Sequence, residues 1–383
     1  MTSTNITHFH QARTFRTRVA LTLTMLLLLV AAATTMAHAQ TYSVLHKLGS
    51  NTGDPWYPQW IGLFAQGRDG NLYSTSQAGD PLNGQSYGTV FQLTPAGSVT
   101  VLHSFGSGGF PNGGLTLGTD GSLYGTSFRD GLGYGTVFKI TTSGGFTVLH
   151  NFNGSTEGSD AHAAPIQGTD GNFYGTTYYG ALGKLGMVYK MTPSGTMTVL
   201  YTFSGSSGGL RLPAALIQGT DGNFYGTTIG GGQPICNGGC GGIYKMTPAG
   251  KLTVLHTFNG TDGEYPYGAI IQASDGNFYG TTYGDGSGTF GVIYKMTPAG
   301  VLTVIHTFLE TDTLGIDPRA GLIQTTDGKF YGAANSLSNA HGVLFQVTST
   351  GNYSVIHRFT GTDGANPQVS LFQHTNGTLY GDT

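Results

Sequence analysis

Short apolar runs alternate with Gly-rich polar stretches from about residue 42 to the end of the chain. Short runs between turn residues predict β-strands, because a helix needs a longer segment with a 3.6-residue period. Four such runs follow one another at 165–167, 172–177, 187–191 and 197–201. The runs are apolar on both sides of the pleat, which indicates a sheet covered on both faces. The pattern therefore predicts four short strands, termed A to D below.

These four strands form a unit of about fifty residues that recurs along the chain. Its marker is a turn followed by an aromatic strand, as in Asp170-Gly-Asn-Phe-Tyr174. Successive copies of the marker are spaced by 51, 50, 51, 54, 52 and 49 residues, and they begin at Asp69, Asp120, Asp170, Asp221, Asp275, Asp327 and Asn376. Seven copies at nearly constant spacing indicate one structural module with little inserted between the copies.

Short hairpins connect strand A to B and strand C to D. Thr-Asp-Gly joins A to B, where Gly adopts positive φ and Asp bonds its own backbone. Thr-Pro-Ser-Gly or Thr-Pro-Ala-Gly joins C to D, where Pro presets φ. Four antiparallel strands per unit, repeated seven times, predict an all-β fold, the β-propeller. A linear β-solenoid is the alternative, but its coils are usually shorter and pair in parallel, so we favour the propeller.

Counting strands predicts a ring with one gap. Strands A, B and D each occur seven times, with the first D at 42–46, whereas strand C occurs six times. We expect seven four-stranded blades with the last blade incomplete, because it combines the C-terminal A and B with the N-terminal D. The missing strand suggests that the natural chain continues beyond Thr383, and an eighth blade stays an alternative.

The composition fits a folded, turn-rich β protein. The 383 residues include 65 Gly and 14 Pro, and 9% are charged, which excludes a helical bundle or a coiled coil. Gly shows no three-residue period, which excludes collagen, and 11% aromatic residues argue against a disordered chain.

Residues 1–39 have the features of an export signal peptide. Three arginines precede an apolar run at 19–33, and residues 37–39 read Ala-His-Ala, a cleavage-site pattern. A membrane anchor is the competing interpretation, but the run is short for a spanning helix. We expect cleavage near Ala39 and a single propeller domain at 40–383, secreted, periplasmic or at the cell surface, without a transmembrane segment.

Cleavage changes the net charge from −3 to −6, because 13 basic residues then face 19 acidic ones. This acidic balance disfavours a nucleic-acid partner. We expect a monomer without a cofactor.

The only cysteines, Cys236 and Cys240, lie in one Gly-rich loop. In an exported protein they predict a disulfide. The ring that it closes is very small, so it fixes the loop locally rather than stabilising the fold. A metal site would need two more ligands at comparable spacing, and none is near in the sequence, so we expect no metal.

The repeat resembles a known bacterial family. Gly-Thr-Asp-Gly-Asn-Phe-Tyr-Gly-Thr-Thr, then Gly-x-Val-Tyr-Lys-Met-Thr-Pro-Ser-Gly, then Thr-Val-Leu-His-x-Phe is similar to the choice-of-anchor tandem repeat family called GloVer. The resemblance covers residues 42–382 and implies an exported repeat protein, often with a C-terminal anchor. It implies no activity and no catalytic residues. The first copy departs from the pattern at Ser74, and the third departs at Tyr201.

Residues that recur in every unit are expected to be structural. Symmetry-related histidines are too far apart to share an ion, so each should satisfy a hydrogen bond in its own blade. One carboxylate per turn is too few for calcium. The strand C lysines should lie along the blade with buried stems or pair with a turn aspartate. The histidines are His46, His103, His150, His256, His306 and His357, and the lysines are Lys139, Lys190, Lys245 and Lys295.

Function is expected where the units differ. Chain direction places the B–C and D–A loops together on one face, the loop face. Flat aromatics beside carboxylates and glycines suit a carbohydrate, because sugar rings stack on aromatic faces. The alternative is that these aromatics fill gaps between loops. The candidates are Trp56, Tyr57, Trp60, Tyr178, Tyr179, Glu264, Tyr265, Tyr267 and Tyr283, with Asp285 nearby.

The sequence thus predicts a binding module for a glycan or a cell-surface protein. The alternative is a polysaccharide-cleaving hydrolase or lyase, which would need unrepeated acids or bases at the same loops. Candidates are Glu157, Asp160, His162, Glu310 and Asp312. No nucleophile elbow, phosphate loop or zinc motif occurs in the sequence, so the binding module is favoured.

Overall fold

The computed structural model describes residues 41–51, 54–55, 64–79, 87–106, 109–111, 113–180, 185–204, 211–284, 290–309, 315–335, 341–368 and 370–383. The chain divides into two units, Met1–Tyr42 and Ser43–Thr383, and every strand lies in the second. The expected export signal at 1–39 lies outside the described residues. No helix among the described residues is long and apolar enough to cross a membrane.

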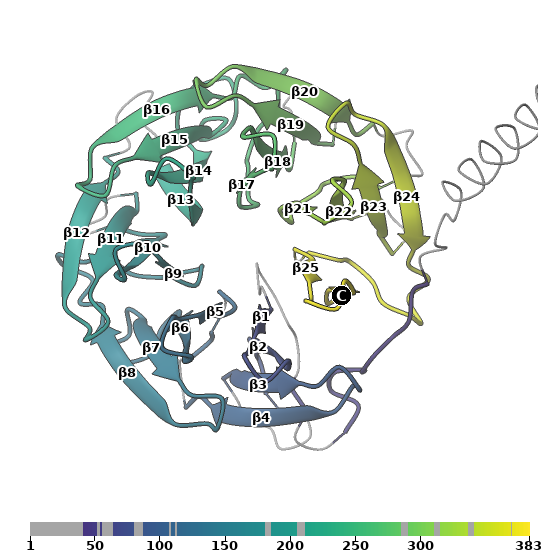
Figure 1. Ribbon diagram of the computed structural model, residues 1–383. Coiled ribbons are helices and arrows are strands. Elements are labelled where there is room, and N and C mark those ends of the chain that lie inside the picture. Colours follow the sequence, from purple (N-terminus) through teal and green to yellow (C-terminus); the bar gives the residue numbers. More distant parts are fainter. Residues whose placement is uncertain are drawn as a thin grey trace, which may run out of the picture. The chain divides into compact units, whose positions relative to one another are not determined.

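The second unit is an all-β propeller with six four-stranded antiparallel blades and one two-stranded sheet (Figure 1). Blade 1 contains β1 (Ala65–Gln66), β2 (Leu72–Ser76), β3 (Thr89–Leu93) and β4 (Val99–Ser104). Blade 2 contains β5 (Thr116–Leu117), β6 (Leu123–Ser127), β7 (Thr136–Ile140) and β8 (Phe146–Asn151). Blade 3 contains β9 (Ile166–Gln167), β10 (Phe173–Thr177), β11 (Met187–Met191) and β12 (Met197–Thr202).

Blade 4 contains β13 (Arg211–Gln218), β14 (Phe224–Gly230), β15 (Gly242–Met246) and β16 (Leu252–Thr257). Blade 5 contains β17 (Ile271–Gln272), β18 (Phe278–Thr282), β19 (Val292–Met296) and β20 (Leu302–Thr307). Blade 6 contains β21 (Ile323–Gln324), β22 (Phe330–Ala334), β23 (Val343–Val347) and β24 (Tyr353–Arg358). The two-stranded sheet pairs β25 (Phe372–Gln373) with β26 (Leu379–Tyr380).

The predicted order A to D is confirmed in all six blades, with strand A innermost and strand D at the rim (Figure 1). Every pairing among the described strands is antiparallel and stays within one unit, which excludes the linear solenoid for them. The expected first strand D was wrong, because residues 42–46 form no strand. In each complete blade strand C lies between B and D and supplies the hydrogen-bond partners of D, and residues 42–46 have no such neighbour.

Neighbouring blades are joined by an aromatic contact between their second strands. The Tyr of one strand B packs on the Phe of the next strand B, with ring centroids 4.0 Å apart for Tyr124 and Phe173 and 3.9 Å apart for Tyr174 and Phe224. The same pairing recurs in the following blades, for Tyr225–Phe278 and Tyr279–Phe330, at 4.2 and 4.1 Å. Successive strand residues face opposite sides, so the Phe-Tyr pairs at 173–174, 224–225 and 278–279 each contact both neighbouring blades. Units 1, 2 and 7 have Leu in place of the Phe.

The aspartate of the A–B turn accepts a hydrogen bond from the hydroxyl of the same tyrosine. Asp170 Oδ2 accepts hydrogen bonds from the Tyr174 hydroxyl at 2.9 Å and from Lys190 Nζ at 2.8 Å. The expected lysine–aspartate pairing is confirmed in four blades, for Lys139–Asp120, Lys190–Asp170, Lys245–Asp221 and Lys295–Asp275. Burial opposes ionisation of Asp120, but hydrogen bonds that include one from Lys139 outweigh it and lower its pKa to about 2. The aspartates are therefore structural.

Four of the six strand D histidines pair with an acidic residue of the loop that follows, as predicted, whereas His103 and His306 stack on an aromatic ring of the next unit. His256 Nε2 lies 2.9 Å from Asp262 Oδ2 in the following loop, and His150 lies 3.1 Å from Glu157. His46 and His357 pair with Asp54 and Asp363 in the same way. His103 instead stacks on Phe146 of the next unit, at 3.7 Å between ring centroids.

A glutamine of strand A links the A–B turn of one blade to the next blade at several junctions. The Thr119 N–H donates to Gln167 Oε1 at 2.8 Å, and the Thr169 N–H donates to Gln218 Oε1 at 2.9 Å. The Thr375 N–H, which follows β25, donates to Gln66 Oε1 of β1 at 3.1 Å. The two-stranded sheet therefore contacts blade 1 through the same type of hydrogen bond that joins blade 2 to blade 3.

We predict that Gln66→Ala weakens this junction specifically. It removes the acceptor of Thr375 N–H and the donor to Thr375 Oγ1, at a cost of about 1 to 2 kcal/mol. Hydrogen exchange at residues 372–380 should accelerate.

The matched control is Gln218→Ala, which removes the equivalent bonds to Thr169 between two complete blades. It should leave exchange at 372–380 unchanged. Equal exchange of this segment in both variants would show that Gln66 does not hold the junction.

Candidate functional site

The D–A loops share one unusual backbone position. Among the described residues, the non-Gly residues with positive φ are Phe110, Asp160, Tyr265, Asp317 and Asn366, one in each of five D–A loops. The N–H of each donates to a B–C loop carbonyl of the same blade, for example Asp317 to Phe290 at 2.8 Å and Tyr265 to Cys240 at 2.9 Å. Such a conformation costs about 1 to 3 kcal/mol in a non-Gly residue, and its recurrence indicates a fixed loop geometry.

In three of these loops the residue two positions later, which is His162, Tyr267 or Arg319, contacts aromatic side chains. In the loop before β21 this residue is Arg319, whose guanidinium carbon lies 4.5 Å from the ring centroid of Tyr283 and 5.8 Å from that of Tyr267. The two rings are 5.7 Å apart and nearly perpendicular, at 84°. We call Tyr267, Tyr283, Asp317 and Arg319 the arginine cluster. It joins the D–A loop of blade 4 with the B–C and D–A loops of blade 5.

The charges of the arginine cluster are not neutralised by an ion pair. Burial raises the pKa of the Asp317 carboxyl to about 6, against the opposing effect of the Arg319 charge. Among the described residues Arg319 makes no salt bridge, and its buried Nε has no hydrogen-bond partner. The cluster therefore combines two aromatic rings, a guanidinium with an unused donor and a carboxyl group near its midpoint of titration at pH 6.

A second group, the histidine cluster, lies between blades 2 and 3. The ring centroid of His162 lies 5.1 Å from that of Phe128 and 5.0 Å from that of Tyr178. The Arg129 guanidinium carbon lies 4.9 Å from the Phe128 centroid. Burial lowers the pKa of His162 to about 4, so its imidazole is neutral at pH 7. Burial raises the pKa of Asp160, and the charge of Arg129 opposes this shift.

The structure brings some predicted residues together and separates others. Tyr267 and Tyr283 meet in the arginine cluster, and Tyr178 contacts Tyr179, which is 46% exposed. Tyr265 lies elsewhere, because its hydroxyl donates to the Asn237 carbonyl at 2.8 Å. Glu264 forms a backbone bridge with Gly284, and Glu157 is the partner of His150. Trp56, Tyr57, Trp60, Asp285, Glu310 and Asp312 lie outside the described residues and stay predictions.

Sequence reasoning missed Arg319, Asp317 and Arg129. A signal was present, because Asp317-Pro-Arg-Ala aligns with Tyr265-Pro-Tyr-Gly on the proline after the positive-φ residue. Alignment of the units at this proline would have shown Arg319 in the place of Tyr267.

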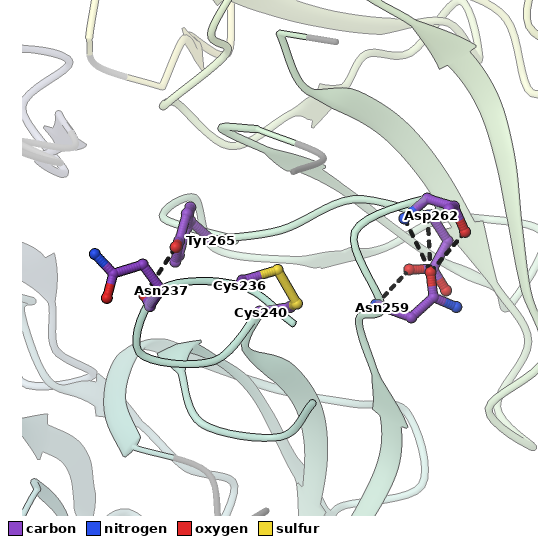
Figure 2. The surroundings of a disulfide bond; sticks show 7 residues. Cys236, Asn237, Cys240, Asn259, Asp262 and Tyr265 are labelled. Atoms are coloured by element: carbon purple, nitrogen blue, oxygen red, sulfur yellow. Dashed lines mark hydrogen bonds between the residues drawn. A yellow bond between two sulfur atoms is a disulfide. The ribbon is translucent and has the colours of Figure 1, made fainter. Parts of the chain in front are cut away.

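The disulfide loop lies beside Tyr265 (Figure 2). Cys236 and Cys240 are joined as the sequence led us to expect. The sequence offered no further ligand at comparable spacing, but in space a Glu264 oxygen and the two sulfurs lie within 4.8 Å of one another. A disulfide has no thiolate to offer a metal. We therefore assign this loop a structural role, in which the Tyr265 hydrogen bond to Asn237 ties it to the D–A loop of blade 4.

The sequence profile of the Gloeobacter/Verrucomicrobia repeat matches residues 32–233 and 164–383, which together span most of the chain. The chain belongs to this family. The GloVer resemblance of the repeat is thus confirmed. No match was found among curated proteins.

Two crystal structures resemble this Gloeobacter/Verrucomicrobia repeat protein. A protein from Lactobacillus plantarum is 17% identical, with a TM-score of 0.58 over 83% of this chain and 88% of the other. An oligogalacturonate lyase from Vibrio parahaemolyticus is 12% identical, with a TM-score of 0.54 over 85% and 88% of the two chains. At these identities the likeness supports the propeller fold alone.

We predict that Asp317→Asn stabilises this GloVer protein in a pH-dependent way. The folded-state pKa of about 6 lies above the ordinary value of 3.8, so the folded state binds the proton more tightly. Wild-type stability should therefore fall as pH rises from about 4 to 6. Asn cannot ionise, so the variant should gain about 1 to 2 kcal/mol over wild type above pH 6.5, after allowance for partial exposure.

Thermal melts of both proteins from pH 4 to pH 8 measure this difference, and the pH 4 point is the internal control. A stability gap that is independent of pH would contradict a raised pKa at Asp317.

We also predict that Cys236 and Cys240 are oxidised to each other in the purified protein. Alkylation followed by intact mass measurement should show two modified thiols only after reduction. Replacing both cysteines with Ser should change exchange in the loop around Tyr265 more than the melting temperature, since the closed ring is small. Alkylation without reductant would refute the pairing.

Proposed function

We propose that this protein is an exported, monomeric binding module that holds a glycan on the loop face, with the arginine cluster at the site. The observation that carries the proposal is the convergence of Tyr267, Tyr283 and Arg319 from three separate loops. Sugar rings stack on aromatic faces, while charged and polar groups bond their hydroxyls. Tyr267 and Arg319 are specific to their units, whereas Tyr283 and Asp317 are matched by Tyr178 and Asp160 in one other unit.

The proposal includes a seventh blade formed by β25, β26 and residues 43–47. A Cβ at Gly97 would lie 2.6 Å from the Leu45 carbonyl oxygen, as one at Gly250 would lie 2.7 Å from that of Leu200 in strand D of the preceding blade. His46 pairs with Asp54 as the other strand D histidines pair with their loops. Residues 43–47 therefore take the position of a strand D without its ladder. A closed ring would hold all loops of the loop face around one axis.

The histidine cluster supports the second candidate function, cleavage of a polysaccharide. A neutral imidazole and a carboxyl with a raised pKa are the groups that general acid–base catalysis requires. Their contacts to Phe128 and Tyr178 also provide a stacking surface. The charge of Arg129 acts on Asp160 and opposes the rise of its pKa.

Binding and cleavage are separated by one experiment. The mature protein is incubated with a panel of cell-wall and plant polysaccharides, and both retention and the release of reducing or unsaturated ends are measured. We expect retention without release. Tyr267→Ala and Tyr283→Ala should each weaken retention about tenfold, because each removes a stacking face worth about 1 to 2 kcal/mol.

Tyr87→Ala is the matched control, since Tyr87 is an exposed loop tyrosine outside both clusters. It should not change retention. Product release that disappears in His162→Ala or Asp160→Asn would establish the enzyme instead. A folded protein that retains no polysaccharide would refute the glycan proposal.

A further inference from the structure

We propose that the arginine cluster recognises a carboxylate on the glycan, so that the ligand is an acidic polysaccharide of the uronate type. This inference rests on the proposed glycan-binding function and names the class of sugar. It starts from one side chain, Arg319, whose charge has no ion-pair partner among the described residues.

Arg319 differs in this respect from the lysines of the repeated strands and turns. Five lysines of the repeated strands or turns lie within 4 Å of a turn aspartate, at 2.7 to 3.7 Å. Arg68 donates to the Thr119 carbonyl. The buried Nε of Arg319 has no acceptor, and Asp317, two residues away, acts on it through its charge but forms no salt bridge with it.

A carboxylate is the acceptor that this arrangement fits. A buried donor without a partner costs about 1 to 3 kcal/mol, which an incoming acceptor would relieve. Tyr283 and Tyr267 lie against the guanidinium as stacking partners, which leaves its N–H groups for acceptors in its plane. The fork of a guanidinium matches a planar carboxylate with two parallel hydrogen bonds.

The neighbouring groups favour a sugar acid over a bare anion. Tyr267 and Tyr283 present two nearly perpendicular rings, which a sugar ring can stack on. The Asp317 carboxyl can accept a hydrogen bond from a hydroxyl, but it would repel a densely charged anion such as a phosphate. A uronate unites one carboxylate, hydroxyls and an apolar ring face in a single residue.

The test compares three probes of similar chain structure by calorimetric titration of the mature protein. The probes are polygalacturonate, its fully methyl-esterified form and neutral galactan. Wild type should bind polygalacturonate about tenfold or more tightly than the ester, since the ester removes the charge but keeps the ring. Arg319→Gln should abolish this preference, and Arg319→Lys should retain part of it, because it keeps the charge without the fork.

Lys251→Gln is the control for net charge, because Lys251 is an exposed cation of a C–D turn, on the face away from the loop face. It should leave the preference intact. The melting temperature of each variant verifies its fold. If Arg319→Gln does not fold, the partial loss of the preference in Arg319→Lys tests the inference instead.

Equal affinity for acid and ester, or a preference that survives in Arg319→Gln, overturns the acidic-glycan inference and leaves glycan binding intact. Binding of poly-glutamate as tight as that of polygalacturonate shows that the site takes acidic peptides, which also overturns it. Binding of none of the polysaccharides refutes the proposed function itself.

Discussion

The propeller depends on the contact between the tyrosine of one strand B and the phenylalanine of the next. Tyr174 and Phe173 are neighbours in sequence but face opposite blades, so each unit is fixed to both of its neighbours by two adjacent residues. The Tyr174 hydroxyl, at the end of the same ring, bonds Asp170 in the turn of its own blade. One short stretch therefore sets the turn, the strand and the spacing between blades. This explains why its sequence changes so little from copy to copy.

At the opposite end of each blade, a buried Phe after strand D, such as Phe152 or Phe258, recurs as a packing residue, but the rest of the D–A loop varies. The loops there differ in length and composition, yet their backbones keep one positive-φ position that bonds the B–C loop. This backbone geometry holds Asp160, Tyr265 and Asp317 alike, so it does not depend on the side chain. The residue two positions on is then free to be His162, Tyr267 or Arg319. A conserved backbone and a variable side chain together are what a scaffold for ligand binding requires.

The sequence was sufficient for the blades because their determinants are local. Turn residues at fixed offsets and a repeated aromatic strand B define strands A to D without knowledge of distant contacts. Asp170 of the A–B turn and Lys190 of strand C could be paired from their positions in one unit. Strand D at 42–46 was wrong because a strand forms only beside a partner. The arginine cluster was missed because its members come from three loops, and the sequence does not specify how far each loop reaches. Tyr265 and Tyr267 look equivalent in sequence, but the first bonds the disulfide loop.

The separation of repeated packing residues from variable loop residues also explains why similarity to distant propellers indicates the fold but not the function. A chain with 12% identity still superposes because blade packing needs only an aromatic or apolar pair per unit, and many sequences provide one. The chemistry of the loop face depends on far fewer residues. In the arginine cluster, the relevant property is a guanidinium with no ion pair among the described residues, and in the histidine cluster it is a buried imidazole whose pKa is lowered. Neither property follows from the backbone, because a lysine paired with an aspartate in place of Arg319 would leave the fold unchanged and remove the unused donor.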